Sequence, residues 1–141
     1  MAKEQALQTL QAWHDLLEKR EFDRLRPLAA ETVVFRSPAF FTPYPGVEAL
    51  VHIIATVNTI FQEFVYHREF WTEGYDAVVL EFSARIGDKT LKGIDIISFD
   101  DAGQIREFEV MIRPANAAVA LGEAMAAKAG PGLKALLGKP A

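Results

Sequence analysis

Between Phe64 and Arg113 hydrophobic and polar residues alternate with a period of two. Val78, Leu80 and Phe82, for example, alternate with polar or small neighbours. This period is typical of β-strands that bury one face. The turn-like segments EGYD, GDK and DDAG divide the stretch into consecutive antiparallel strands. The predicted strands are 64–72, 77–86, 89–99 and 105–113.

Helical spacing replaces this alternation on both sides of the strands. Apolar residues recur three or four positions apart in 5–20 and 47–61, which predicts two amphipathic helices. A shorter helix is predicted over 22–28, a strand over 32–37, and an alanine-rich helix from Pro114 to about Ala129. The order predicts an α+β fold, in which N-terminal helices pack on one face of a curved, mostly antiparallel sheet and a C-terminal helix follows.

The length of 141 residues suits a single domain. We expect this domain to span residues 1–129. The Gly130-Pro131-Gly132 sequence then interrupts the helical pattern, so residues 130–141 are predicted to form a weakly ordered tail.

Charge and composition exclude several classes of partner. The formal net charge is −4 with no basic tract, so we expect neither nucleic acid nor an anionic membrane surface as a partner. No apolar run is long enough for a transmembrane helix, and the first residues lack a signal-peptide pattern. A cytoplasmic protein is therefore expected. The chain has no cysteine, its three histidines lack ligand spacing, and it has no phosphate-binding glycine motif, so no metal or cofactor is predicted.

One acidic residue interrupts the apolar face of the predicted sheet. The hairpin parity that pairs 77–86 with 89–99 continues the face of Leu80 and Phe82 onto Asp95 and Ile97. Asp95 is then the only acid on the inner face of three strands. A buried carboxylate without partners costs several kcal/mol or becomes protonated. Asp95 is therefore either an acid that lines a pocket, or a structural residue bonded to a backbone amide or an arginine.

The residue that faces Asp95 from strand 64–72 depends on the EGYD turn. A two-residue turn points His67 inward, which would give an acid/base pair with Asp95. A three-residue turn points Arg68 inward instead, which would give a structural ion pair. We predict His67 and keep Arg68 as the alternative.

Other side chains with chemical potential have simpler alternatives. His14 could reach the pocket or pack in the core, and His52 is predicted to face solvent. Phe40, Phe41 and Tyr44 lie in a proline-rich loop that is either a lid over the pocket or a hydrophobic seal.

The order of elements, together with the segment GIDIISFDDAGQIREFEV, resembles the nuclear transport factor 2-like superfamily over nearly the whole chain. The apolar strand with an aspartate, the acidic glycine turn and the Ile-x-Glu strand resemble the SnoaL-like (polyketide-cyclase-like) and ketosteroid-isomerase-like members. The resemblance implies a cone-shaped roll. That scaffold hosts isomerases, cyclases, dehydratases, epoxide hydrolases and non-catalytic binders, so it implies no single activity.

The resemblance also implies roles for particular positions. Asp95 falls where the isomerases keep a protonated aspartate and the cyclases an acid/base aspartate. Trp13 replaces the tyrosine of the isomerases and Ser37 replaces their general base, and these differences argue against ketosteroid isomerisation. Epoxide hydrolysis needs a second inward carboxylate, whereas Glu107 and Glu109 are predicted to face outward.

We therefore predict a homodimer, paired through the outer sheet face, that binds a small apolar molecule with a carbonyl or hydroxyl group. Asp95 and His67 are the predicted catalytic residues of cofactor-free isomerisation, cyclisation or dehydration. The alternative is a non-catalytic ligand-binding or dimerisation module, which a salt bridge from Arg68 to Asp95 in a filled core would favour. An unpaired Asp95 oxygen in an open pocket would favour the enzyme. The predicted pocket lining is Trp13, Ser37, Ile53, Leu80, Phe82, Ile97, Phe108, Val110 and Ile112.

Overall fold

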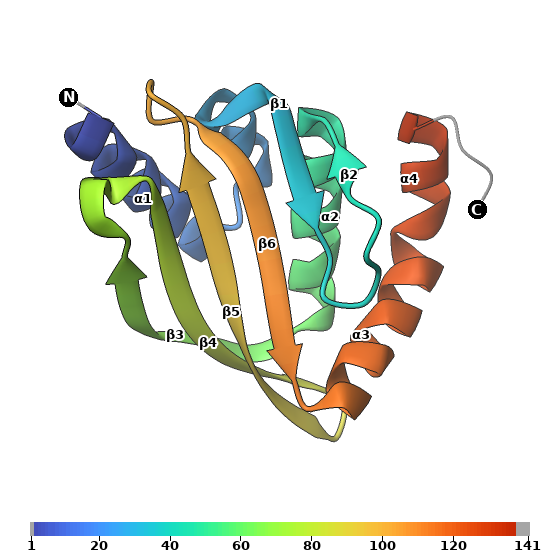
Figure 1. The fold of residues 1–141 in the computed structure, drawn as a ribbon. Helices are drawn as coiled ribbons and strands as arrows, with labels where there is room; N and C mark the ends of the chain where they lie inside the picture. The colour runs from blue at the N-terminus through green and yellow to red at the C-terminus, as the bar shows by residue number, and fades with distance from the viewer. Residues whose placement is uncertain (1, 138–141) are drawn as a thin grey trace.

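The computed structural model describes residues 2–137, and within them six strands form one curved sheet (Figure 1). The strand order is β2-β1-β6-β5-β4-β3, with β1 parallel to β6 and all other neighbours antiparallel. The predicted α+β class and the meander of four strands are confirmed. The strands are β1 (Ala29–Arg36), β2 (Tyr44–Pro45), β3 (Gln62–Trp71), β4 (Ala77–Ile86), β5 (Lys89–Phe99) and β6 (Ile105–Arg113).

The helices leave one face of the sheet bare. Figure 1 shows α1 and α2 against one face of the sheet, while α3 and α4 continue from β6 along the side of the molecule near β1 and α2. No helix in residues 2–137 is long and apolar enough to cross a membrane. The helices are α1 (Ala2–Lys19), α2 (Val47–Ile60), α3 (Ala115–Lys128) and α4 (Gly130–Leu137), with short 3-10 helices η1 (Phe22–Leu28) and η2 (Glu73–Tyr75).

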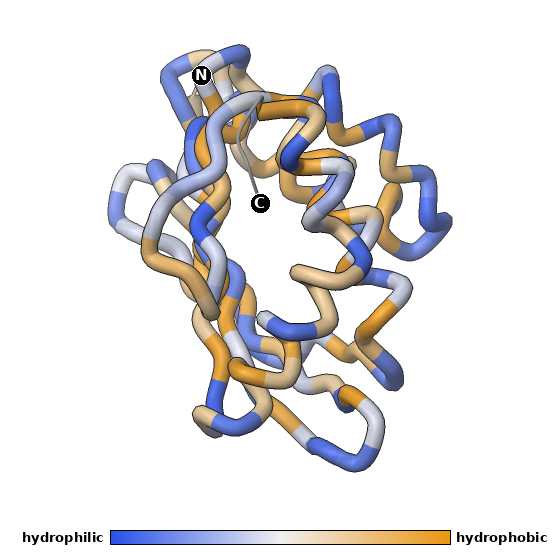
Figure 2. The backbone as a smooth tube through the Cα atoms, turned by 90° about the vertical axis from the view of Figure 1, so that its right-hand side faces the viewer, coloured by the Kyte–Doolittle hydropathy of each residue, from blue (hydrophilic) through white to orange (hydrophobic). Residues whose placement is uncertain are grey.

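The core fills the space between the helices and the inner face of the sheet, which we define as the helix-covered face. Hydrophobic and hydrophilic residues alternate along the strands, as the colouring in Figure 2 shows. Full burial of a large apolar side chain contributes about 1.5–3 kcal/mol, so the alternation itself fixes which face turns inward. The largest fully buried side chains include Trp13 and Leu16 of α1, Leu50 of α2, and Leu80, Phe82, Ile97 and Phe108 of the sheet.

The C-terminal segment differs from the prediction of a weakly ordered tail. Residues 130–137 form α4, because Pro131 lies in the first turn, where its missing N–H costs no helical hydrogen bond. His52, predicted to face solvent, instead lies against this segment, with its Nε2 3.0 Å from the Ala129 carbonyl oxygen. A Cβ at Gly132 would lie 2.5 Å from the same Nε2, so a larger residue there would displace the His52 ring. The rest of the predicted tail, 138–141, lies outside the described residues.

Candidate functional site

A pocket with a volume of about 330 Å³ lies between the inner face of the sheet and helices α2, α3 and α4. Its walls are mostly apolar. Large side chains come from both layers, including Phe35, Phe108 and Val110 of the sheet and Ile53 of α2. The C-terminal helices supply a third wall, with Leu121, Gly122, Met125, Ala126, Gly130, Leu133, Lys134 and Leu137.

The predicted lining agrees with this pocket in part. Trp13, Ser37, Ile53, Asp95, Phe108 and Val110 line it. Leu80, Phe82, Ile97 and Ile112 do not. Leu80 and Ile97 are packed within the core, and Ile112 packs against it. The Phe64 ring stacks on Phe82 at a centroid distance of 4.9 Å, so Phe64 reaches the pocket in its place.

Asp95 lines the pocket from the middle of β5. It pairs with Leu80 of β4 and Val110 of β6, and its side chain is only 6% exposed, so its predicted inward orientation is confirmed. Tyr66 of β3 donates a hydrogen bond from its hydroxyl to Asp95 Oδ2 at 2.5 Å. Burial raises the pKa of Asp95 to about 7, and the hydrogen bond from Tyr66 opposes that rise.

Trp13 extends this contact into a chain of three side chains. Its indole Nε1–H donates to the Tyr66 hydroxyl oxygen at 3.1 Å, and the same hydroxyl donates to Asp95. Burial, followed by the neighbouring Asp95 carboxyl, raises the pKa of Tyr66 well above its ordinary value. Tyr66 therefore stays protonated at neutral pH and remains a hydrogen-bond donor.

The second oxygen of Asp95 remains available. Among the described residues, Tyr66 makes the one side-chain hydrogen bond that Asp95 receives. Within the same residues, every fully enclosed side-chain nitrogen or oxygen has a hydrogen-bond partner. Oδ1, which has none, is therefore not fully enclosed. Since Asp95 lines the pocket, a ligand there can reach this oxygen.

The prediction that His67 pairs with Asp95 is wrong, and so is the Arg68 alternative. Beyond the turn, Glu69 pairs with Leu80, but the register shifts before Tyr66, which pairs with Phe82. This bulge reverses the alternation, so Tyr66 turns inward. His67 lies 2.7 Å from the Ser83 hydroxyl, and Arg68 forms an ion pair with Glu81 at 2.6 Å. Both partners lie on the outer face of the sheet.

His14 packs rather than lining the pocket. Its ring meets the Tyr66 ring edge-on at a centroid distance of 5.3 Å. Burial lowers the pKa of His14, and the nearby Glu69 carboxylate opposes this. His14 therefore packs against the Tyr66 ring, which corresponds to the packed-core alternative.

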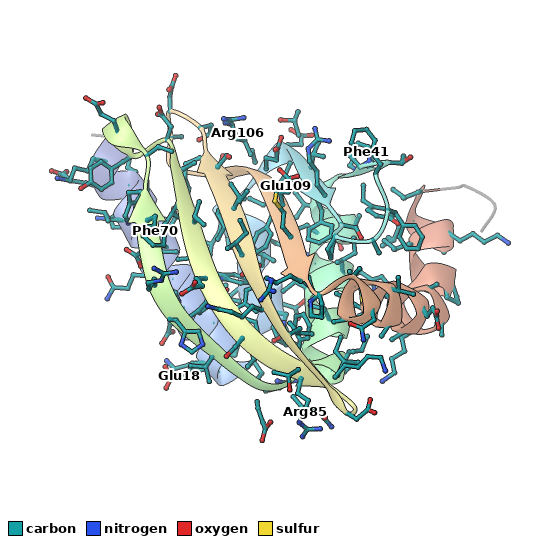
Figure 3. All side chains as sticks on the ribbon, turned by 60° about the horizontal axis from the view of Figure 1, so that its bottom comes forward. Glu18, Phe41, Phe70, Arg85, Arg106 and Glu109 are labelled. Atoms are coloured by element: carbon teal, nitrogen blue, oxygen red, sulfur yellow. The ribbon has the colours of Figure 1, made fainter. Side chains whose placement is uncertain are left out.

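The proline-rich loop contributes to the pocket in two ways. The Ser37 hydroxyl oxygen accepts hydrogen bonds from the backbone N–H of Ala39 at 3.0 Å and of Phe40 at 3.3 Å, which fixes the loop. Phe40 lines the pocket, as does Tyr44. Phe41 is 97% exposed and points away from the body (Figure 3).

Metal-binding geometry is absent from the described residues. No group of three or more histidine, cysteine, aspartate or glutamate side chains in residues 2–137 could hold a metal ion. What the site offers is a mostly apolar chamber with one carboxyl group whose pKa lies near neutrality. Such a group can donate a hydrogen bond, give a proton or accept one at physiological pH.

Comparison with known proteins identifies the family. A model of the SnoaL-like domain matches residues 10–108. The chain belongs to the SnoaL-like family. Its nuclear transport factor 2-like fold, predicted from the order of its elements, is confirmed. No curated protein matches the chain.

Similarity to solved structures covers nearly the whole chain. A steroid delta-isomerase from Pseudomonas aeruginosa is 45% identical, with a TM-score of 0.87 over 92% of this chain and 94% of that one. An uncharacterised bacterial protein with a cystatin-like fold, from Silicibacter pomeroyi DSS-3, is 28% identical, with a TM-score of 0.78 over 84% and 83% of the two chains. A nuclear transport factor 2-like protein of unknown function from Mesorhizobium loti is 18% identical, with a TM-score of 0.67 over 81% and 95%.

Sequence reasoning missed two contributors to this SnoaL-like site. Tyr66 lies two residues before Arg68, so both would share one face of a regular strand. The three-residue-turn alternative would therefore have turned Tyr66 inward as well. The available signal was the phenol itself, because a buried tyrosine hydroxyl usually bonds to a polar partner such as a carboxyl group. Lys134 and Leu137 were missed because the glycine-proline sequence before them predicted the end of regular structure.

Proposed function

We propose that this protein binds a small apolar molecule with a carbonyl or hydroxyl group and catalyses a cofactor-free acid/base reaction on it. The implied class is isomerisation, cyclisation or dehydration. The observation that carries this proposal is Asp95, with one oxygen bound by Tyr66 and the other available inside an apolar pocket. The Arg68 side chain pairs with Glu81, so Asp95 is free of the structural ion pair that would favour a non-catalytic role.

In this proposal Asp95 is the acid/base group. In its protonated form, Oδ1 carries the proton and donates to a ligand oxygen, while Oδ2 continues to accept from Tyr66. In its ionised form, the same oxygen accepts a proton from the ligand. Because its pKa is about 7, both forms are populated near neutral pH, and one group can take a proton from one atom and return it to another.

The similarity to a steroid delta-isomerase makes steroids the first ligands to test. A steroid with a β,γ-unsaturated ketone should quench or shift the fluorescence of Trp13, which lines the pocket. If it is also converted to the conjugated ketone, Asp95→Asn should reduce turnover about 100-fold or more while the chain stays folded. Glu81→Gln on the outer face is the matched control and should leave turnover unchanged. Equal turnover by wild type and Asp95→Asn would exclude the catalytic role.

A non-catalytic ligand-binding module is the second candidate, and the composition of the lining favours it. Apart from Asp95, no carboxyl or imidazole group lines the pocket within the described residues, and Ser37 has no nearby base. Tight binding of steroid or other apolar ligands without any turnover would support this candidate.

We also propose that two copies pair through the outer face of the sheet. No helix of residues 2–137 covers that face, and Figure 3 shows Phe70 and Glu109 on it. Val65, Phe70 and Met111 are 51%, 49% and 48% exposed, which is high for large apolar side chains.

The mass in solution tests this pairing. Light scattering at about 100 μM should give the mass of a dimer, since a stable interface needs an apolar centre of this kind. Phe70→Glu should shift the mass toward the monomer. Phe41→Ser, which removes an even more exposed aromatic ring from the loop, is the control and should not. A monomeric wild type would contradict the proposal.

A further inference from the structure

Two charged residues line the pocket within the described part of the chain, and they come from different walls. Asp95 belongs to β5, in the middle of the sheet, whereas Lys134 belongs to α4. Figure 1 shows β5 and α4 on different sides of the molecule, with β6 and β1 between them. The remaining lining is apolar or neutral. The pocket is therefore electrically asymmetric.

Lys134 is placed to act on a ligand rather than on the protein. Gly130, Lys134 and Leu137 are three or four positions apart and share one side of α4, so the aliphatic part of the lysine lies beside the apolar lining. The residue is exposed, and no carboxylate of the described residues lies within 4.0 Å of its Nζ. Its ammonium group is thus available at the solvent-facing end of the pocket.

The Asp95 end discriminates against negative charge. An anionic group beside Asp95 would meet an apolar wall and a carboxyl group of its own sign when ionised, with Tyr66 already committed to Oδ2. At Lys134 the same anion stays in contact with water and gains a cation. A ligand with one neutral and one anionic end therefore has a single favourable orientation.

We propose that the ligand of this pocket is amphipathic, with an apolar body, a neutral carbonyl or hydroxyl group directed at Asp95, and a carboxylate held at Lys134. This inference rests on the function proposed above, because it assumes that the pocket binds an apolar carbonyl or hydroxyl compound. The inference adds that the ligand has a second polar end, and it gives the orientation in which the ligand binds in the pocket.

A matched pair of probes tests this inference. The first is an androstene ring ketone that carries a carboxylate at the opposite end of its ring system, and the second is its methyl ester. Titration of Trp13 fluorescence should show that the acid binds about threefold to tenfold more tightly than the ester. The preference should weaken as salt is added, since the lysine is exposed.

Variants of the C-terminal helices separate the possible outcomes. Lys134→Gln should abolish the preference for the acid without weakening the ester, and Lys134→Arg should retain it. Lys128→Gln is the control, because Lys128 is also an exposed lysine but does not line the pocket. If acid and ester bind equally to the wild type, or if the preference survives in Lys134→Gln, the inference is overturned while the proposed pocket stands. If neither probe binds, the proposed steroid-like ligand class and this inference both fail.

Discussion

Two carboxyl groups in the middle of the sheet have opposite properties. Asp95 of β5 pairs with Leu80 of β4, and Glu81 follows Leu80 in β4. The two acids therefore lie close together on opposite faces of the sheet. Burial raises the pKa of Asp95 to about 7, whereas hydrogen bonds from Arg68 lower the pKa of Glu81 to about 2. A shift of one residue along a strand changes the face on which a carboxyl group lies. That face decides whether the group titrates near neutral pH or stays ionised there.

The surroundings differ in the same way. On the outer face, Glu81 forms ion pairs with Arg68 at 2.6 Å and with Lys92 at 3.2 Å. On the inner face, Asp95 accepts a hydrogen bond from the Tyr66 phenol, which in turn accepts one from the Trp13 indole, and no cation of residues 2–137 pairs with it. On the outer face the negative charge of Glu81 is therefore balanced by two cations. On the inner face burial favours the protonated, uncharged form of Asp95.

The largest expected effect that would test this contrast is on stability. The pKa of Asp95 rises from 3.8 to about 7 on folding, so the folded state binds this proton more tightly than the unfolded state between these values. The free energy of unfolding should therefore fall as pH rises from about 4 to 7, by up to about 4 kcal/mol in total. Asp95→Asn should lack this decrease, which urea unfolding at several pH values would measure.

Glu81→Gln provides the opposite case. The pKa of Glu81 is lower in the folded state, so its contribution is present above pH 4.5 and is lost as pH falls toward 2. The glutamine variant should therefore follow the wild type in losing stability between about pH 4 and 7. Parallel pH profiles for the wild type and Asp95→Asn would refute the account of Asp95.

A smaller effect on stability is expected from the hydrogen bonds that link Trp13, Tyr66 and Asp95. Tyr66→Phe removes the donor to Asp95 and the acceptor for the Trp13 N–H, so the free energy of unfolding should fall by about 1–3 kcal/mol. Because the Tyr66 hydrogen bond opposes the effect of burial, the pKa of Asp95 should rise further.

Carbon NMR titration of the Asp95 carboxyl group would measure that change. Tyr75→Phe is a suitable control, since the Tyr75 ring packs on Trp71 and its hydroxyl makes no hydrogen bond within residues 2–137. An Asp95 pKa that is unchanged or lower in Tyr66→Phe would mean that the hydrogen bond does not set the protonation of the site.

The fold and the orientation of Asp95 followed from local pattern. In a tight antiparallel hairpin, paired residues face the same side of the sheet. The inward positions of β4 therefore predicted those of β5 and β6, and Asp95 was assigned to the inner face. The strand order, with β1 parallel to β6, could not follow in this way, because it depends on contacts between distant segments.

The partner of Asp95 could not be predicted because β3 contains a bulge. Parity holds from Trp71 to Glu69 and is reversed at Tyr66, and both turn lengths considered from the sequence assumed an uninterrupted strand. Neither His67 nor Arg68 could be placed correctly under that assumption. Both residues instead have partners on the outer face, His67 with Ser83 and Arg68 with Glu81.

The helix α4 contributes a wall of the pocket and yet has no buried residue of its own. The sheet holds the buried carboxyl group, and the sheet together with α1 and α2 contains most of the buried core. Substitutions in the C-terminal segment can therefore reshape one wall of the pocket with little effect on the buried core, while the carboxyl group at the centre stays in place.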